Sequence, residues 1–313
     1  MNLFKVEAVS RAGFTGWMRP WCIGISALLL VLPVHAGPDA DESMGPGTLA
    51  YHLSTNVAAR AAGRTGGYAD ELEFSAPNST GLDRLTNAVW SQAFWLRGVQ
   101  GLSATPIGFT NLTGGQGLPT MVSPRHYLCA THMHPEGYLI AFLDTNNVVH
   151  WRRTLQRVDA GNDISVGILN ADLPPAVGFL PVLPANFTNY LPTTANSLVQ
   201  GIGMNQDFCL FGQPMTFNNR SFINWDSSKT VPLGLTKNWN VTLRAGDSSN
   251  PDMLLIGNQL VLASHNYFAG GGPNYACQIT NINGAMHLLS KKFHVRKDYQ
   301  LTEFPLTNWP AIR

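Results

Sequence analysis

Short apolar runs separated by turn residues follow one another along most of the chain. A first set lies at 107–112, 120–123, 126–130, 138–143, 148–152 and 163–169. A second set lies at 197–202, 207–211, 215–218, 238–244, 253–256 and 259–264. Runs of this length, bounded by Gly, Asn, Asp and Pro, are typical of β-strands joined by turns. The pattern therefore predicts an all-β protein built from two groups of strands.

The segment between the two groups, residues 173–184, contains four prolines. Proline has no N–H to donate to a neighbouring strand, so this segment cannot be a central strand and is expected to connect two structural units. Many short strands divided in this way indicate either two β-barrels or a sandwich. Helices are predicted only at 83–96 and 278–290, and the Gly-, Ala- and Ser-rich stretch 37–75 is expected to be a loosely ordered lead-in.

The N-terminus has the pattern of an export signal. An apolar run at 23–32 follows three basic residues, and it is shorter than the roughly 20 residues needed to cross a bilayer. Small residues at 34–36 then favour cleavage before Gly37, so residues 1–36 are expected to be a signal peptide. The mature protein is expected to be secreted or periplasmic, with no stable membrane association. The alternative is an uncleaved membrane anchor.

Composition narrows the classes of function. Only 12% of the residues are charged and the formal net charge is +1, which excludes a charge-driven nucleic-acid binder. The hydrophobic share of 44% excludes a largely disordered chain. Three cysteines remain after signal cleavage, so at most one disulfide is expected within the chain. The pair Cys209–Cys277 is favoured, because Cys129 lies in an apolar strand.

Three polar side chains lie beside predicted strands. His132 follows one apolar strand, Asp163 begins another, and Ser248 lies in a tight turn. Nucleophilic acyl transfer needs such a set, because a serine hydroxyl attacks only when a histidine takes its proton and a carboxylate orients that histidine. Gly246 lets the backbone turn so that its N–H and that of Ser248 point at a developing oxyanion.

Two other interpretations of these residues are open. Asp159 competes as the orienting carboxylate, although Asp163 is preferred because an apolar strand follows it directly. His126, His132 and His134 are close enough in sequence to suggest a metal site. No carboxylate or cysteine completes that set at a suitable spacing, so no metal is expected.

In this order the three segments resemble the signatures of the trypsin/chymotrypsin-like serine peptidases, including bacterial members. The resemblance covers roughly residues 100–290. It implies two antiparallel six-stranded β-barrels at 100–184 and 185–313, the second with a short C-terminal helix, after a lead-in at 37–99. The active site is then expected in the cleft between the barrels.

The resemblance also implies roles. His132 is expected to be the general base, Asp163 its orienting carboxylate and Ser248 the nucleophile. The N–H groups of Gly246 and Ser248 are expected to form the oxyanion hole. The implied activity is that of a secreted serine endopeptidase, which acts on a protein or peptide substrate and requires no cofactor.

Substrate contacts follow from the same resemblance. Thr242 falls at the position that selects the substrate side chain, and because it is not acidic, substrates with Lys or Arg there are not favoured. Ser264, or a near neighbour, is expected to begin the strand that binds the substrate backbone. His265 either lines the pocket or ends a strand.

The sequence departs from that family around the nucleophile and the histidine. Ser249 and Asn250 replace two glycines, and the usual cysteine pair around the histidine is absent. No Ile-Val-Gly-Gly start supplies an amino terminus for Asp247, so Asp247 has another partner or the site is preformed without cleavage, which is preferred. Two alternative functions are open: a catalytically inactive trypsin-like binding protein, and a secreted β-sandwich module for adhesion or glycan binding.

Overall fold

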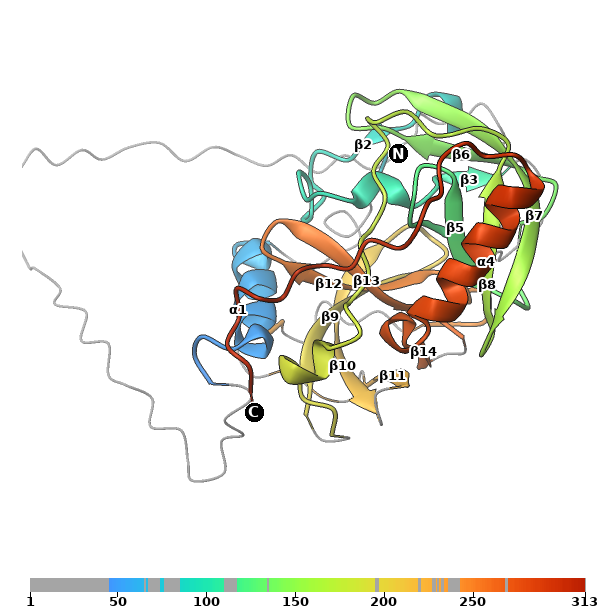
Figure 1. Cartoon of the computed structure of the whole chain (residues 1–313). Coiled ribbons are helices and arrows are strands. Elements are labelled where there is room, and N and C mark those ends of the chain that lie inside the picture. Colours follow the sequence, from blue (N-terminus) through green and yellow to red (C-terminus); the bar gives the residue numbers. More distant parts are fainter. Residues whose placement is uncertain are drawn as a thin grey trace, which may run out of the picture. The chain divides into compact units, whose positions relative to one another are not determined.

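The computed structural model describes residues 45–64, 66, 74–75, 85–109, 117–133, 135–194, 197–218, 221–226, 229, 231, 234–235, 243–267 and 270–312. Within these residues the strands form two six-stranded sheets and a two-stranded ribbon, and every pairing between named strands is antiparallel. Each six-stranded sheet is curled into a half barrel (Figure 1). The predicted all-β fold of two antiparallel barrels is confirmed.

The first sheet has the strand order β3-β6-β7-β8-β5-β4. Its strands are β3 (Gly108–Phe109), β4 (Thr120–Met121), β5 (His126–Ala130), β6 (Leu139–Leu143), β7 (Val149–Gly161) and β8 (Ile164–Leu169). β5 and β8 are buried along their whole length and pair with each other. Ala130 at the end of β5 lies opposite Ile164 at the start of β8, so the residues just beyond these positions are neighbours.

The second sheet has the strand order β13-β12-β9-β10-β11-β14. Its strands are β9 (Val199–Met204), β10 (Leu210–Asn218), β11 (Phe222–Trp225), β12 (Pro251–Ile256), β13 (Gln259–His265) and β14 (Gly271–Pro273). β10 unites two predicted runs, 207–211 and 215–218, although Pro214 lies between them. Pro214 lies opposite Gln200 of β9, and its carbonyl accepts a hydrogen bond from the Asp226 N–H at 3.1 Å. The strand thus continues through the proline with the loss of one N–H donor.

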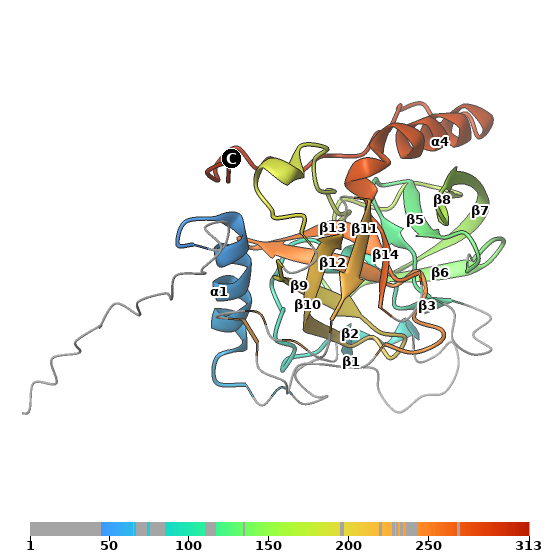
Figure 2. The same ribbon diagram turned by 90° about the horizontal axis from the view of Figure 1, so that it is seen from below.

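Helix α1 (Leu49–Ala61) corrects the expectation of a loosely ordered lead-in. The Thr48 hydroxyl caps its first turn by accepting a hydrogen bond from the Tyr51 N–H at 3.3 Å. The apolar face of α1, which includes the fully buried Leu53 and Val57, packs against β9 and β12 (Figure 2). The small and polar residues that surround these apolar positions conceal the helical period in the sequence.

The other two helix predictions have opposite outcomes. The helix expected at 83–96 is wrong for most of its length: Leu85 and Thr86 are helical, but Val89–Trp90 is strand β2, paired with β1 (Phe74–Ser75), and turns follow it. The late helix is confirmed as α4 (Ile279–Lys292), and it packs against β7 and β8 of the first sheet. Short 3₁₀ turns are η2 (Leu102–Ala104), η3 (Phe187–Asn189) and η5 (Tyr275–Cys277). The C-terminal helix therefore covers the first barrel, although it follows the second barrel in the sequence.

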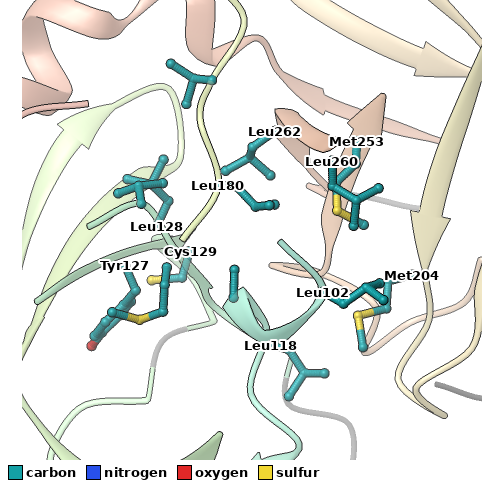
Figure 3. Close-up of a cluster of buried hydrophobic side chains, with 14 of the residues drawn as sticks. Leu102, Leu118, Tyr127, Leu128, Cys129, Leu180, Met204, Met253, Leu260 and Leu262 are labelled. Carbon is teal, nitrogen blue, oxygen red and sulfur yellow. The ribbon is translucent and has the colours of Figure 1, made fainter. Parts of the chain in front are cut away.

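One apolar cluster joins the two sheets (Figure 3). Leu128 of β5, Met204 of β9 and Leu262 of β13 are buried in it. Leu180, from the proline-rich connection, is buried in the same cluster. Burying one such side chain fully stabilises a fold by about 1.5–3 kcal/mol. Because the cluster takes side chains from both sheets, it holds one barrel against the other.

The cysteines do not reinforce this core. Cys129 is buried in β5, and burial raises the pKa of its thiol to about 12. The expected Cys209–Cys277 disulfide is wrong: Cys209 is buried, Cys277 is exposed, and no disulfide joins the cysteines of the described part of the chain. The predicted signal segment 1–36 lies outside the described residues, and no described helix is long and apolar enough to cross a membrane.

Candidate active site

His132 lies in a tight turn at the end of β5. The Met133 N–H donates a hydrogen bond to the Ala130 carbonyl at 3.2 Å, which closes the turn around the histidine. His132 Nδ1 lies 2.7 Å from Asp163 Oδ2, and the His132 backbone N–H donates to Asp163 Oδ1 at 3.2 Å. One carboxylate therefore holds both the ring and the backbone of the histidine.

The hairpin between β7 and β8 positions Asp163. Asn162 and Asp163 form the two-residue loop and have φ values of 54° and 62°. Positive φ at both loop residues is what a type I′ hairpin turn requires, and Asn and Asp tolerate it best after Gly. The competing carboxylate, Asp159, is exposed and accepts a hydrogen bond from the Gly161 N–H at 2.8 Å. Asp163, and not Asp159, therefore contacts His132.

A second imidazole faces the same carboxylate. His265, at the end of β13, is buried, and its Nε2 lies 3.8 Å from Asp163 Oδ2. Its Nδ1 lies 2.5 Å from the hydroxyl of Tyr275. Burial by itself raises the pKa of Asp163. The imidazoles of His265 and His132 lower it by more than burial raises it, so the pKa lies below its ordinary value and Asp163 is ionised at neutral pH. Burial lowers the pKa of His265, which keeps that ring neutral.

Ser248 lies in the second of two successive turns in the segment before β12. The Asp247 N–H donates to the Arg244 carbonyl at 3.0 Å, with Gly246 at a φ of 101°. The Asn250 N–H then donates to the Asp247 carbonyl at 3.1 Å, with Ser249 at a φ of 75°. Positive φ at the third position is the mark of a type II turn.

The serine is thereby presented at the loop surface. Ser248 is partly exposed at the second position of the later turn. Within the described part of the chain, neither the Gly246 N–H nor the Ser248 N–H donates a hydrogen bond to a protein group. Both donors named for the oxyanion hole are therefore available to a ligand.

Asp247 is held by backbone N–H groups of the described chain. Its carboxylate is buried, and it accepts hydrogen bonds from the Gln206 N–H at 2.7 Å and the Arg244 N–H at 2.6 Å. Burial raises the pKa of Asp247, although both hydrogen bonds act in the opposite direction. The expected other partner of Asp247 is thus the backbone around it, and the loop is held in the chain as it stands.

The Ser248 hydroxyl does not contact the histidine directly. Ser248 Oγ donates to the Tyr267 carbonyl at 3.2 Å, and no hydrogen bond joins it to His132 in the described structure. The Tyr267 ring in turn packs edge-on against the His132 ring, with centroids 5.6 Å apart. Tyr267 therefore contacts both side chains. A neutral hydrogen bond contributes only about 1 kcal/mol net, so the hydroxyl can leave the Tyr267 carbonyl at low cost.

A cavity of about 340 Å³ opens beside these residues, between the first sheet and the second. It is lined by Asn162, Asp163, Ser221, Phe222, Tyr267, Pro273 and Gln278. A larger cavity of about 630 Å³ lies near Trp90, Arg97 and Thr145 and includes none of the candidate catalytic residues. Of the three candidate catalytic residues, Asp163 alone lines the smaller cavity, together with Tyr267, which contacts His132 and Ser248.

Two expected substrate contacts have different outcomes. Ser264 is fully buried in β13, and its hydroxyl donates to the His265 carbonyl at 3.1 Å, so its side chain does not line the cavity. The near neighbour that contacts Ser248 is Tyr267, through its backbone carbonyl. Thr242 and most of the predicted strand 238–244 lie outside the described residues.

His126 and His132, two of the three histidines considered as a metal site, face different partners. His126 is buried, with Nδ1 3.0 Å from Ser123 Oγ and Nε2 3.2 Å from Ser290 Oγ. Burial lowers the pKa of His126 to about 4, so this ring is neutral and joins β5 to α4. His132 instead faces Asp163, and His134 lies outside the described residues.

No family model matches the chain, and no curated protein matches it either.

Proposed function

We propose that the protein is an exported serine endopeptidase of the trypsin/chymotrypsin-like type. The observation that carries the proposal is the 2.7 Å contact between His132 Nδ1 and Asp163 Oδ2 on one barrel. The loop of Ser248 lies beside this pair on the other barrel, in contact with the His132 turn through Tyr267. A base, its orienting carboxylate and a hydroxyl therefore lie close together where the barrels meet, and Asp163 and Tyr267 also line the 340 Å³ cavity.

In the proposed reaction, the Ser248 hydroxyl turns from the Tyr267 carbonyl toward His132 Nε2. The oxygen attacks a peptide carbonyl while Nε2 takes the proton, and the N–H groups of Gly246 and Ser248 stabilise the resulting oxyanion. The C–N bond then breaks, and His132 returns the proton to the leaving amine. Water, activated by the same nitrogen, attacks the acyl-enzyme and releases the second product.

The ionisation of the groups supports these roles. The lowered pKa of Asp163 supplies a negative charge next to His132 Nδ1, which stabilises the imidazolium as it forms. The carboxylate also holds the proton on Nδ1, so Nε2 is left unprotonated and can accept from Ser248. Export through residues 1–36 remains a prediction of the sequence.

Labelling with a serine-reactive fluorophosphonate tests the proposal. Wild-type protein is expected to be labelled, with the adduct mapped to Ser248 by mass spectrometry, and Ser248→Ala is expected to stay unlabelled. The neighbouring Ser249 is buried and bonded to the first barrel, so it does not substitute for Ser248.

One observation favours a second function, that of an inactive trypsin-like binding protein. The Ser248 hydroxyl is bonded to the Tyr267 carbonyl and not to His132. If folded wild-type protein resists labelling across pH 6–9, the cavity serves binding alone and the endopeptidase proposal fails.

A further inference from the structure

The two residues after Ser248 form side-chain hydrogen bonds to the other barrel. Ser249 Oγ accepts a hydrogen bond from the Ala130 N–H at 2.8 Å and donates one to the Met133 carbonyl at 2.7 Å. Asn250 Oδ1 accepts a hydrogen bond from the Leu118 N–H at 2.8 Å. Both side chains are buried, with Ser249 1% and Asn250 0% exposed. Three backbone groups of the first barrel are thus bonded by two consecutive side chains of the second.

The partners of Ser249 are the two ends of the turn that carries His132. Ala130 ends β5, Met133 follows the histidine, and the Met133 N–H is already bonded to the Ala130 carbonyl. The Ser249 hydroxyl hydrogen-bonds to the Ala130 N–H and to the Met133 carbonyl, so it bridges the two ends of the turn. Because Ser248 precedes Ser249 directly, the position of the nucleophile is tied to that of the base.

The backbone conformation of Ser249 has a cost that the hydrogen bonds of its hydroxyl offset. A φ of 75° is a left-handed conformation, which costs a residue other than glycine roughly 1–2 kcal/mol. Two hydrogen bonds of about 1 kcal/mol each offset that cost. Glycine would adopt this φ without strain but would leave the Ala130 N–H and the Met133 carbonyl without these bonds.

The first barrel also touches the loop backbone. Gly117 is buried, and a Cβ atom added to it would lie 1.2 Å from the Ser248 carbonyl oxygen. The loop therefore lies directly on the segment that contains Gly117 and Leu118, and Asn250 bonds the second of these residues.

We propose that Ser249 and Asn250 form a clamp between the barrels, and that they are positioning residues which set the placement of Ser248 relative to His132. The clamp acts through the backbone of Ala130, Met133 and Leu118 and touches no substrate. The proposal rests on the catalytic roles proposed for Ser248 and His132. It also gives Ser249 and Asn250 a function where the family resemblance implies two glycines.

Two variants of Ser249 separate the hydrogen bonds from the strain. Ser249→Ala loses both bonds and keeps the strain, whereas Ser249→Gly loses both bonds and relieves it. Both are expected to react with the fluorophosphonate roughly 10- to 100-fold more slowly than wild type, because a displacement of about 1 Å costs that much in rate. Ser249→Gly is expected to resist urea better than Ser249→Ala without recovering the labelling rate.

The matched control is Ser103→Ala. Ser103 is also buried, and its hydroxyl accepts a hydrogen bond from the Gly178 N–H at 2.8 Å, away from the candidate site. This variant is expected to lose stability but to react at the wild-type rate. Ser249→Gly reacting at the wild-type rate would overturn the clamp, because the rate would then follow stability or strain and not the hydrogen bonds.

A second readout does not depend on activity. Amide hydrogen exchange is expected to speed up at Ala130 in both Ser249 variants, and the ring signals of His132 in NMR spectra are expected to shift. Unchanged exchange at Ala130 together with unchanged His132 signals would overturn the clamp. If wild-type protein is not labelled at all, the proposed function fails, and the clamp is judged by these two NMR measurements.

Discussion

The two halves of the candidate site are built in different ways. The base half, His132 with Asp163, belongs to one sheet, and its hydrogen bonds join residues 31 positions apart in the sequence. The nucleophile half, the loop around Ser248, is held to the first barrel by hydrogen bonds that join residues 116 to 132 positions apart. The contact between His132 and Asp163 therefore needs only one sheet, whereas the contacts of the second half are made only when both barrels are folded and docked.

Because of this difference, variants in the two halves are expected to affect the reaction rate and the stability differently. Damage to the base half is expected to lower the reaction rate and leave the docking of the barrels intact. Damage to the nucleophile half is expected to lower both the reaction rate and the stability, because the same contacts hold the loop and the interface. Variants in the two halves can therefore test whether the division is real.

The largest effect is expected from Asp163→Asn. A neutral amide no longer holds the proton on His132 Nδ1, so the reactive nitrogen loses its lone pair, and the fluorophosphonate rate is expected to fall by roughly 10⁴-fold. Urea unfolding is expected to show a stable fold. Asp159→Asn, at an exposed carboxylate of the same hairpin, is the control and is expected to react as wild type does. A large rate loss in the control would show that the hairpin, and not the Asp163 carboxylate, matters.

Gly117→Ala is expected to displace the loop around Ser248, which is the nucleophile half. Its methyl group would collide with the Ser248 carbonyl, so the loop must move, and the labelling rate is expected to fall about 100-fold. Overpacking of this kind also destabilises a fold by about 1–3 kcal/mol, which denaturant unfolding measures. Gly178→Ala is the control, because its added Cβ would meet no atom closer than 3.4 Å. Normal labelling of Gly117→Ala would show that the loop is not held at this contact.

The first barrel is expected to lose stability in acid. The pKa of buried His126 is lowered to about 4, so between pH 6.5 and 4 the unfolded chain binds a proton that the folded chain does not. Stability is therefore present above pH 6.5 and falls by about 3 kcal/mol as the pH approaches 4. Urea unfolding at pH 7 and pH 4 measures this loss as the difference between wild type and His126→Gln, because the buried Asp252 changes the stability in the opposite direction over the same range; His287→Gln, at an exposed histidine, should behave as wild type does. Equal acid loss in His126→Gln would contradict the assignment.

The second barrel is expected to lose stability in base. Asp252 of β12 is fully buried, and its Oδ1 lies 2.9 Å from Trp225 Nε1. Burial raises the pKa of Asp252 to about 8, so the folded chain keeps a proton that the unfolded chain has already lost. The contribution of Asp252 to stability is therefore fully present below about pH 4 and is lost as the pH rises to 8, with about 2 kcal/mol of the loss between pH 6 and 8. Asp252→Asn should remove this loss, and an unchanged alkaline loss in that variant would contradict the account.

The sequence predicted the base half better than the nucleophile half. β5 has the predicted bounds, and Asp163 could be chosen over Asp159 because an apolar strand follows it. Both features are local, since an apolar run and a two-residue turn are visible in neighbouring residues. The helix α1 escaped prediction because its apolar face is narrow and lies among small and polar residues.

The contacts between the barrels could not be predicted in the same way. Ser249 reads as an ordinary turn residue, and its importance depends on a left-handed backbone and on partners more than 100 positions away. The contact between His265 and Asp163 likewise requires β13 to lie beside the β7–β8 turn. The Cys209–Cys277 pair was misplaced because sequence position alone does not tell which side chains lie close together in the fold.

The most direct test of the proposed endopeptidase activity is whether the protein forms an acyl-enzyme on a peptide. Wild-type protein and Ser248→Ala would be mixed with a peptide library, quenched in acid after short times and analysed by intact mass spectrometry. The account predicts that wild type cleaves peptides and carries a transient acyl group on Ser248, and that Ser248→Ala does neither. Folded wild-type protein that leaves every peptide intact and carries no acyl group would contradict it.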